Sequence, residues 1–164
     1  MVFDASTLIL LAKVDLLEAV ATERLIVITP IVQEESIRLG AADSRLIARL
    51  VSKGRIVVRD VLEGARDIKK LQKDFSIAAG EASSLWLAHK LGVALATDDG
   101  RTIRAAKILG VPFATAVHFL IESYRNGRLT REFASAKLEK LVKFGRYHRR
   151  IIKDAKMQLE GGGN

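Results

Sequence analysis

The sequence has no cysteine among its 164 residues, which excludes disulfide bonds, thiolate metal sites and cysteine nucleophiles. Aromatic residues make up only 5% of the chain, so its core has to be built from aliphatic side chains and alanine. Long hydrophobic runs are also missing. The apolar stretch within MVFDASTLILLAK is too short to span a bilayer, and no basic region precedes it as in a signal peptide. These absences lead us to expect a soluble, cytoplasmic protein with no membrane partner.

The apolar fraction of 49% is ample for one hydrophobic core, and the length of the chain suits one compact domain. The sequence has no internal repeat and no segment with the composition of a linker. We therefore expect a single domain over residues 1–160, followed by a disordered tail over residues 161–164.

The charge of the chain is strongly positive, with a formal net charge of +8 at pH 7. Between residues 125 and 156, lysine and arginine greatly outnumber aspartate and glutamate. A basic balance of this kind predicts attraction to polyanions, chiefly nucleic acid or an anionic membrane, and it also suits an acidic protein partner. Arg146, Arg149 and Arg150 are the candidate RNA-binding residues, and the nearby Phe144 and Tyr147 could stack on bases. The alternative is a solvated helix face without a ligand.

Short runs of apolar residues alternate with segments that have helical periodicity. This alternation predicts an α/β fold, in which helices cover both faces of a parallel sheet. The expected strands are Val2–Asp4, Leu25–Ile28, Ile56–Val58 and Val93–Ala96, whereas Pro112–Thr115 is interpreted as an extended connection.

Helix signals are clearest near glycine, proline and small polar residues. Ser6 is expected to cap the first helix, and Pro30 should open a later helix that ends at Gly40. The last helix is expected over Tyr147–Leu159.

Acidic residues recur where the expected strands end or where the following helices begin. Because ligands of such sheets bind beyond the carboxyl ends of the strands, these side chains should converge at one edge. Crowded carboxylates repel each other unless a cation or a raised pKa relieves the repulsion. Oxygen ligands suit Mg²⁺ or Mn²⁺, which can activate water and stabilise the leaving oxygen of a phosphodiester. The candidate acids are Asp4, Glu34, Glu35, Glu81, Asp98 and Asp99.

Each acid also has a purely structural interpretation. Asp4 and the Asp98-Asp99-Gly100 sequence could only cap helices or form a turn. Glu34, Glu35 and Glu81 could only complement helix dipoles. The functional interpretation depends on all of them lying at the same ends of their elements.

Three stretches of the sequence together resemble the PIN-domain family, and most closely its archaeal and bacterial branch of small toxin-like ribonucleases. FDASTLILLAKVDLL is similar to the family's opening, in which an aspartate ends the first strand. ITPIVQEE is similar to its proline, valine and glutamate motif, and that spacing favours Glu35 as the functional acid without excluding Glu34. GEASSLWLAHKLGVALATDDGRTIRAAKILGVP resembles its most diagnostic stretch.

The resemblance covers nearly the whole chain and implies a three-layer fold around a parallel sheet of about five strands. It implies cleavage of RNA that depends on Mg²⁺ or Mn²⁺. The implied catalytic residues are Asp4, Glu35, Glu81, Asp99 and Asp98, of which Asp4, Glu81, Asp98 and Asp99 would hold the metal. Asp99, two residues after Thr97, is favoured over Asp98, although spacing leaves that choice open. Many relatives are toxins with a cognate antitoxin, and many are homodimers. A homodimer is therefore expected here, and the sequence leaves open whether a cognate antitoxin exists.

Three further residues are expected to support the site. Ser6 and Thr97 could hydrogen-bond a carboxylate or a metal-bound water, or could equally be local caps. Arg101 could hold a phosphate of the RNA bidentately, or could pair with a nearby acid.

A function of another class is also open to this sequence. The chain could be a PIN-fold module that binds RNA or protein and cleaves nothing. The complete set of acidic positions favours the nuclease, since a binding module has no need of them.

Overall fold

The computed structural model describes residues 1–38 and 42–161. The predicted helix end at Gly40 and residues 162–164 of the predicted tail lie outside the described residues, and Gly161 follows the last helix. Five strands form one sheet: β1 (Val2–Phe3), β2 (Ile26–Ile28), β3 (Ile56–Val58), β4 (Leu95–Ala96) and β5 (Phe113–Ala114).

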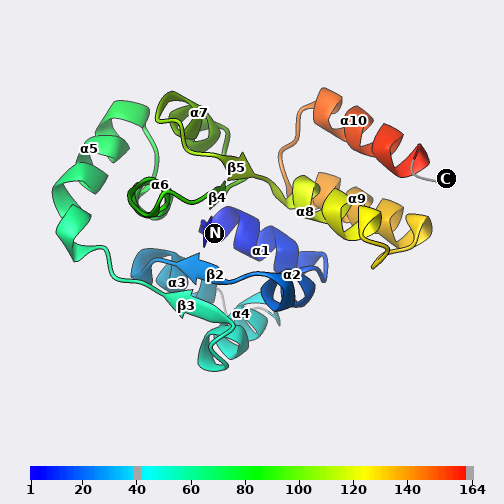
Figure 1. Ribbon diagram of the computed structural model, residues 1–164, viewed down its shortest axis with the longest axis horizontal. Coiled ribbons are helices and arrows are strands. Elements are labelled where there is room, and N and C mark those ends of the chain that lie inside the picture. Colours follow the sequence, from blue (N-terminus) through cyan, green and yellow to red (C-terminus); the bar gives the residue numbers. More distant parts are fainter. Residues whose placement is uncertain (39–41, 162–164) are drawn as a thin grey trace.

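All neighbouring strands are parallel, in the order β3-β2-β1-β4-β5 (Figure 1). The helices between them are α1 (Ala5–Lys13), α2 (Leu17–Glu23), α3 (Pro30–Ile37), α4 (Ala42–Ser52), α5 (Ala65–Phe75), α6 (Ala79–Leu91) and α7 (Gly100–Ile108). A short 3₁₀ helix, η1 (Leu62–Gly64), precedes α5, and α8 (Ala116–Arg125), α9 (Arg131–Phe144) and α10 (Arg149–Glu160) complete the chain. The predicted α/β fold with a parallel sheet flanked by helices is confirmed.

Helices cover both faces of the sheet. Successive side chains of a strand point to opposite faces, so each strand contributes side chains to a core on either side. Phe3 packs into one core with residues of α1, α2, α4 and α8–α10, whereas its neighbour Val2 packs into a second core with α5, α6 and α7. The two cores are mostly aliphatic, as the scarcity of aromatic residues requires.

The structure corrects several local predictions, including the strand predicted over Val93–Ala96, of which only Leu95–Ala96 is β4. Phe113–Ala114 is a fifth strand rather than a connection, because it pairs with β4. A strand of two residues is too short to show the alternating pattern that predicts a strand. Leu25 lies outside β2 and is 60% exposed. Asp4, not Ser6, caps α1. The last helix begins only at Arg149, with His148 as its cap, so Tyr147 lies before it.

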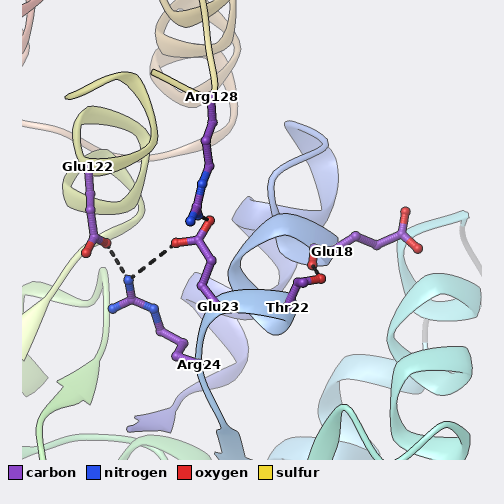
Figure 2. Close-up of polar contacts among 6 residues, drawn as sticks. All are labelled: Glu18, Thr22, Glu23, Arg24, Glu122 and Arg128. Atoms are coloured by element: carbon purple, nitrogen blue, oxygen red, sulfur yellow. Dashed lines mark hydrogen bonds and ion pairs between the residues drawn. The ribbon is translucent and has the colours of Figure 1, made fainter. Parts of the chain in front are cut away.

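Ion pairs connect α8 and the turn after it to the end of α2 (Figure 2). A guanidinium nitrogen of Arg24 lies 2.6 Å from a carboxylate oxygen of Glu122 and 3.8 Å from one of Glu23. Arg128, in the turn after α8, also pairs with Glu23. The Arg24–Glu122 and Glu23–Arg128 pairs join residues about a hundred positions apart, so they fix α8 and the turn after it against the first part of the chain.

None of the described helices is both long and apolar enough to cross a membrane.

Candidate functional site

The acids after β1 and β4 lie side by side because these two strands are neighbours in the sheet. Val2 pairs with Leu95 and Phe3 with Ala96, so Asp4 and the Thr97-Asp98-Asp99 sequence leave the sheet together. From β1 the chain first builds β2 and β3 on one side, and then returns to build β4 and β5 on the other. The edge between β1 and β4 is therefore the topological switch point, where parallel sheets bind ligands.

Asp4 is completely buried at this edge. One carboxylate oxygen accepts hydrogen bonds from the Ser6 hydroxyl at 2.8 Å and from the Thr7 backbone N–H at 2.9 Å. The other accepts one from the Thr97 hydroxyl at 2.5 Å. Burial raises the pKa of Asp4 to about 7, and the charge of the nearby Asp98 adds to this rise. The three hydrogen-bond donors act to lower the pKa. A carboxyl with such a pKa is easily ionised by a nearby cation.

The two supporting hydroxyls predicted from the sequence therefore bind Asp4 directly. Each also accepts a hydrogen bond from the backbone after β4: Ser6 from the Asp98 N–H at 3.4 Å, and Thr97 from the Asp99 N–H at 3.3 Å. Through these contacts the hydroxyls tie the end of β1 to the loop that carries the other two aspartates.

Asp98 is held on both of its carboxylate oxygens. It accepts hydrogen bonds from the Thr7 hydroxyl at 2.7 Å, from the Ala116 backbone N–H at 3.0 Å and from the Tyr147 hydroxyl at 2.6 Å. Burial raises the pKa of Asp98, while these donors act to lower it. The side chain thus connects α1, the start of α8 and the segment before α10.

Asp99 has a different environment. One of its carboxylate oxygens caps α7, accepting from the backbone N–H groups of Arg101 at 3.0 Å and Thr102 at 2.8 Å and from the Thr102 hydroxyl. Its second oxygen has no hydrogen-bond donor among the described residues. Asp99 can therefore offer an oxygen to a ligand without giving up its role as a cap.

Glu81 lies in the first turn of α6 and is close enough to Asp99 for their charges to interact. One of its oxygens accepts a hydrogen bond from the Ala78 backbone N–H at 2.5 Å. The pKa of Glu81 is raised, mainly by burial and further by the Asp99 charge, while the Ala78 N–H and Arg101 lower it. Glu81 and Asp99 thus form an acidic pair at the edge of the sheet.

Glu35 extends this acidic group from α3. Its carboxylate packs against Gly80, where a β-carbon would lie only 2.2 Å from a glutamate oxygen. Burial raises its pKa, the Glu81 charge adds to that rise, and the Gly80 N–H opposes it. Glu34 instead pairs in solvent with Arg38 at 2.5 Å. Of the two neighbouring glutamates, Glu35 therefore belongs to the acidic edge.

The predicted RNA-binding arginines lie on two different parts of the surface. The Arg101 guanidinium donates to the Ser76 backbone carbonyl at 2.9 Å, in a groove that also contains Arg104. Arg146, Arg149 and Arg150 are exposed, in and after the connection from α9 to α10.

The donor set fits a hard divalent cation, because every candidate ligand is a carboxylate or hydroxyl oxygen. In the part of the chain that the structure describes, no three His, Cys, Asp or Glu side chains are arranged to hold one metal ion together. Mg²⁺ needs only one or two carboxylates when waters and substrate phosphates complete its shell. The pair of Glu81 and Asp99 satisfies that smaller requirement.

The contacts that Thr7, Gly80 and Tyr147 make with the acids were not predicted from the sequence. Thr7 stands at the third helical position after a capping aspartate, so its N–H contact to Asp4 had a local signal. Its hydroxyl contact to Asp98, and that of Tyr147, join residues 91 and 49 positions apart. No local sequence pattern predicts contacts between residues so far apart in the chain.

A comparison with protein-family models matches residues 1–160 to a family described as DUF3368: PIN domain. Neither the curated proteins nor the solved structures give a significant match.

Proposed function

The chain belongs to the PIN-domain family, and we propose that it is an endoribonuclease that needs Mg²⁺ or Mn²⁺ to hydrolyse RNA phosphodiester bonds. The observation that carries the proposal is the acidic pair of Glu81 and Asp99, with the buried Asp4 bound to the same loop through Thr97. These acids come from distant parts of the sequence and meet at the switch point of the sheet. Members of this family are commonly nucleases and typically bind divalent metals.

Glu81 and Asp99 would be the principal metal ligands, with Asp4 and Asp98 beside them. When bound, the cation would offset the clustered negative charge and polarise the phosphodiester. Glu35, whose pKa is also raised, would contribute to the acidic environment from the far side of Glu81. Of the two aspartates after Thr97, Asp99 is the better ligand, since both oxygens of Asp98 already accept hydrogen bonds.

The remaining residues would position the acids and the RNA. Ser6 and Thr97 hold the carboxylate of Asp4 in one orientation through direct hydrogen bonds. Arg101, anchored to the Ser76 carbonyl and close to Glu81, would bind a phosphate of the strand. The net charge of +8 supports RNA as the substrate, because phosphate contacts supply most of the attraction to nucleic acid.

A toxin role is the finer part of this proposal. The resemblance of the opening and of the Gly80–Pro112 stretch to small toxin-like ribonucleases supports it, and it would bring a cognate antitoxin as partner. A homodimer and a single domain over residues 1–160 belong to the same proposal. Co-expression with the product of the adjacent gene would test the toxin role, since an antitoxin should relieve the growth arrest that the chain causes alone.

A non-catalytic PIN-fold module that binds RNA or protein is the second candidate. It is favoured by one observation: among the described residues, no three acidic or histidine side chains are arranged around a common metal position. A module of this kind would bind RNA equally well with and without divalent ions.

Cleavage of a labelled single-stranded RNA by the purified protein tests the proposal. We expect products with Mn²⁺ or Mg²⁺, none in EDTA, and none from Asp4→Asn or Glu81→Gln. Glu34→Gln is the matched control, because Glu34 pairs with Arg38 in solvent and should keep full activity. Cleavage that persists in EDTA or in Glu81→Gln would overturn the proposal. Ion-independent RNA binding without cleavage would support the second candidate.

A further inference from the structure

The connection between α9 and α10 touches the acidic edge through one side chain. Figure 1 shows this connection passing beside the beginning of α8. There the Tyr147 hydroxyl donates a 2.6 Å hydrogen bond to a carboxylate oxygen of Asp98. The same carboxylate accepts from the Ala116 N–H and the Thr7 hydroxyl. Tyr147 therefore joins the C-terminal part of the chain to the residues that hold the site.

The local backbone is built around the ring of Tyr147. Gly145 ends α9 in an extended conformation. A β-carbon at Gly145 would lie 2.4 Å from a ring carbon of Tyr147 and 3.0 Å from the Leu141 carbonyl oxygen. A larger residue would thus push the ring away from its place against the backbone. The half-buried ring is held between Gly145 on one side and Asp98 on the other.

Basic side chains stand immediately before and after this anchored tyrosine. Arg146 precedes it, and Arg149 and Arg150 begin α10 two and three residues later. All three are exposed, and none has an acidic partner among the described residues. By contrast, Arg24 and Arg128 pair with glutamates. The charges beside Tyr147 are therefore available to an external polyanion.

We propose that Tyr147 is a positioning residue that holds the basic segment 146–150 beside the acidic edge as a docking site for RNA phosphates next to the scissile bond. This inference rests on the proposed nuclease function and adds to it the place on the surface where the RNA would bind. RNA is the occupant that the charges favour, because the chain carries a net charge of +8 and these arginines are exposed without acidic partners among the described residues. The hydrogen bond to Asp98 keeps the distance between docking site and acids constant.

The test measures binding of a labelled single-stranded RNA to the full chain in EDTA, where no cleavage is needed, over a range of salt concentrations. Replacing Arg146, Arg149 and Arg150 together by Gln should weaken binding severalfold. It should also reduce the slope of log K against log salt by about 0.7 for each RNA phosphate that the variant no longer neutralises. Tyr147→Phe removes only the hydroxyl and should weaken binding in the same direction by a smaller factor.

Combining the tyrosine and arginine substitutions shows whether their effects on RNA binding are coupled. Coupling distinguishes a positioning role of Tyr147 from a general loss of structure. If Tyr147 acts through the arginines, Tyr147→Phe should have no further effect in the triple Gln variant. Tyr124→Phe is the matched control, because its hydroxyl also anchors α10, at the Leu159 carbonyl, but away from the acids. It should leave RNA binding unchanged. Gly145→Ala displaces the ring and keeps its hydroxyl, so it should reproduce the effect of Tyr147→Phe.

An unchanged dissociation constant for Tyr147→Phe, or additive effects of the tyrosine and arginine changes, would overturn the inference. Equally tight, arginine-dependent binding of polyglutamate would also overturn it, in favour of an acidic protein partner. RNA binding of the expected pattern without any cleavage in Mn²⁺ would refute the nuclease and leave the docking site standing. RNA cleavage by the parent chain, together with RNA binding that Tyr147→Phe does not weaken, would refute the docking site and leave the nuclease standing.

Discussion

The Thr97 hydroxyl donates a 2.5 Å hydrogen bond to the buried carboxylate of Asp4, 93 positions earlier in the sequence. The bond crosses from the end of β4 to the end of β1. A buried carboxylate that loses a donor is left partly unsatisfied, and this costs free energy. The contact therefore matters both for stability and for the ionisation of Asp4.

Thr97→Val should lower the free energy of unfolding by about 1–3 kcal/mol, because it keeps the shape and removes the donor. Thr97→Ser is the control, since it keeps the hydroxyl and should recover most of the loss. Urea unfolding of the two variants measures the difference. Equal stability of Thr97→Val and the parent chain would show that the hydroxyl does not hold the carboxylate.

Asp98→Asn and Asp99→Asn should separate structure from catalysis. Asn at position 98 would turn one accepting oxygen into a donor that faces Thr7, Tyr147 or the Ala116 N–H, so we expect about 1–3 kcal/mol lower stability. Asn at position 99 still caps α7 about as well as Asp and should keep stability.

For Asp99→Asn we expect a loss of RNA cleavage and of Mn²⁺ binding, measured by calorimetry. A fully active Asp99→Asn chain would show that the predicted preference for Asp99 over Asp98 is wrong.

Gly80→Ala should impair the site more than the fold. Its new β-carbon would meet the carboxylate of Glu35, the end of a flexible side chain that can rotate away at little cost. We expect a small change in melting temperature together with reduced cleavage, similar to that of Glu35→Gln. Gly100→Ala is the control, because a β-carbon there meets nothing within 4 Å. Unaltered cleavage by Gly80→Ala would remove Glu35 from the site.

The stability of the metal-free protein should fall as pH rises. Burial raises the pKa of Asp4 from 3.8 to about 7, so between these values the folded chain keeps a proton that the unfolded chain has lost. The free energy of unfolding then decreases with pH, by at most about 1.4 kcal/mol per pH unit for this group. The raised pKa values of Glu35, Glu81 and Asp98 act with the same sign.

Melting temperatures in EDTA and in Mn²⁺ check this expectation. Mn²⁺ should stabilise the chain most at about pH 8, where the carboxylates are ionised, and little at about pH 5. Asp4→Asn should reduce the slope in EDTA. Stability that rises with pH in EDTA, or a Mn²⁺ effect that is largest in acid, contradicts the pKa assignments.

The sequence by itself predicted the main elements and the position of the acids at their ends. Hydrophobic periodicity and helix caps are local signals, so the strand at Ile56–Val58 and the helix ending at Leu91 could be located without a structure. The parallel arrangement then followed from the alternation of strands and helices, and with it the convergence of Asp4 and the Asp98-Asp99 pair. The two-residue strand Phe113–Ala114 could not be found, because its only signal is its pairing with β4.

Only the tertiary structure distinguished between neighbouring acids. Spacing left Asp98 and Asp99 as alternatives. In the structure, Tyr147 donates to Asp98, whereas one oxygen of Asp99 meets no hydrogen-bond donor in the described part of the chain. Tyr147 itself was expected in a helix, whereas it lies before α10 and reaches the site. The physical reason is that caps and periodicity arise within a few residues, while these contacts join segments that meet only when the sheet and the C-terminal helices have packed.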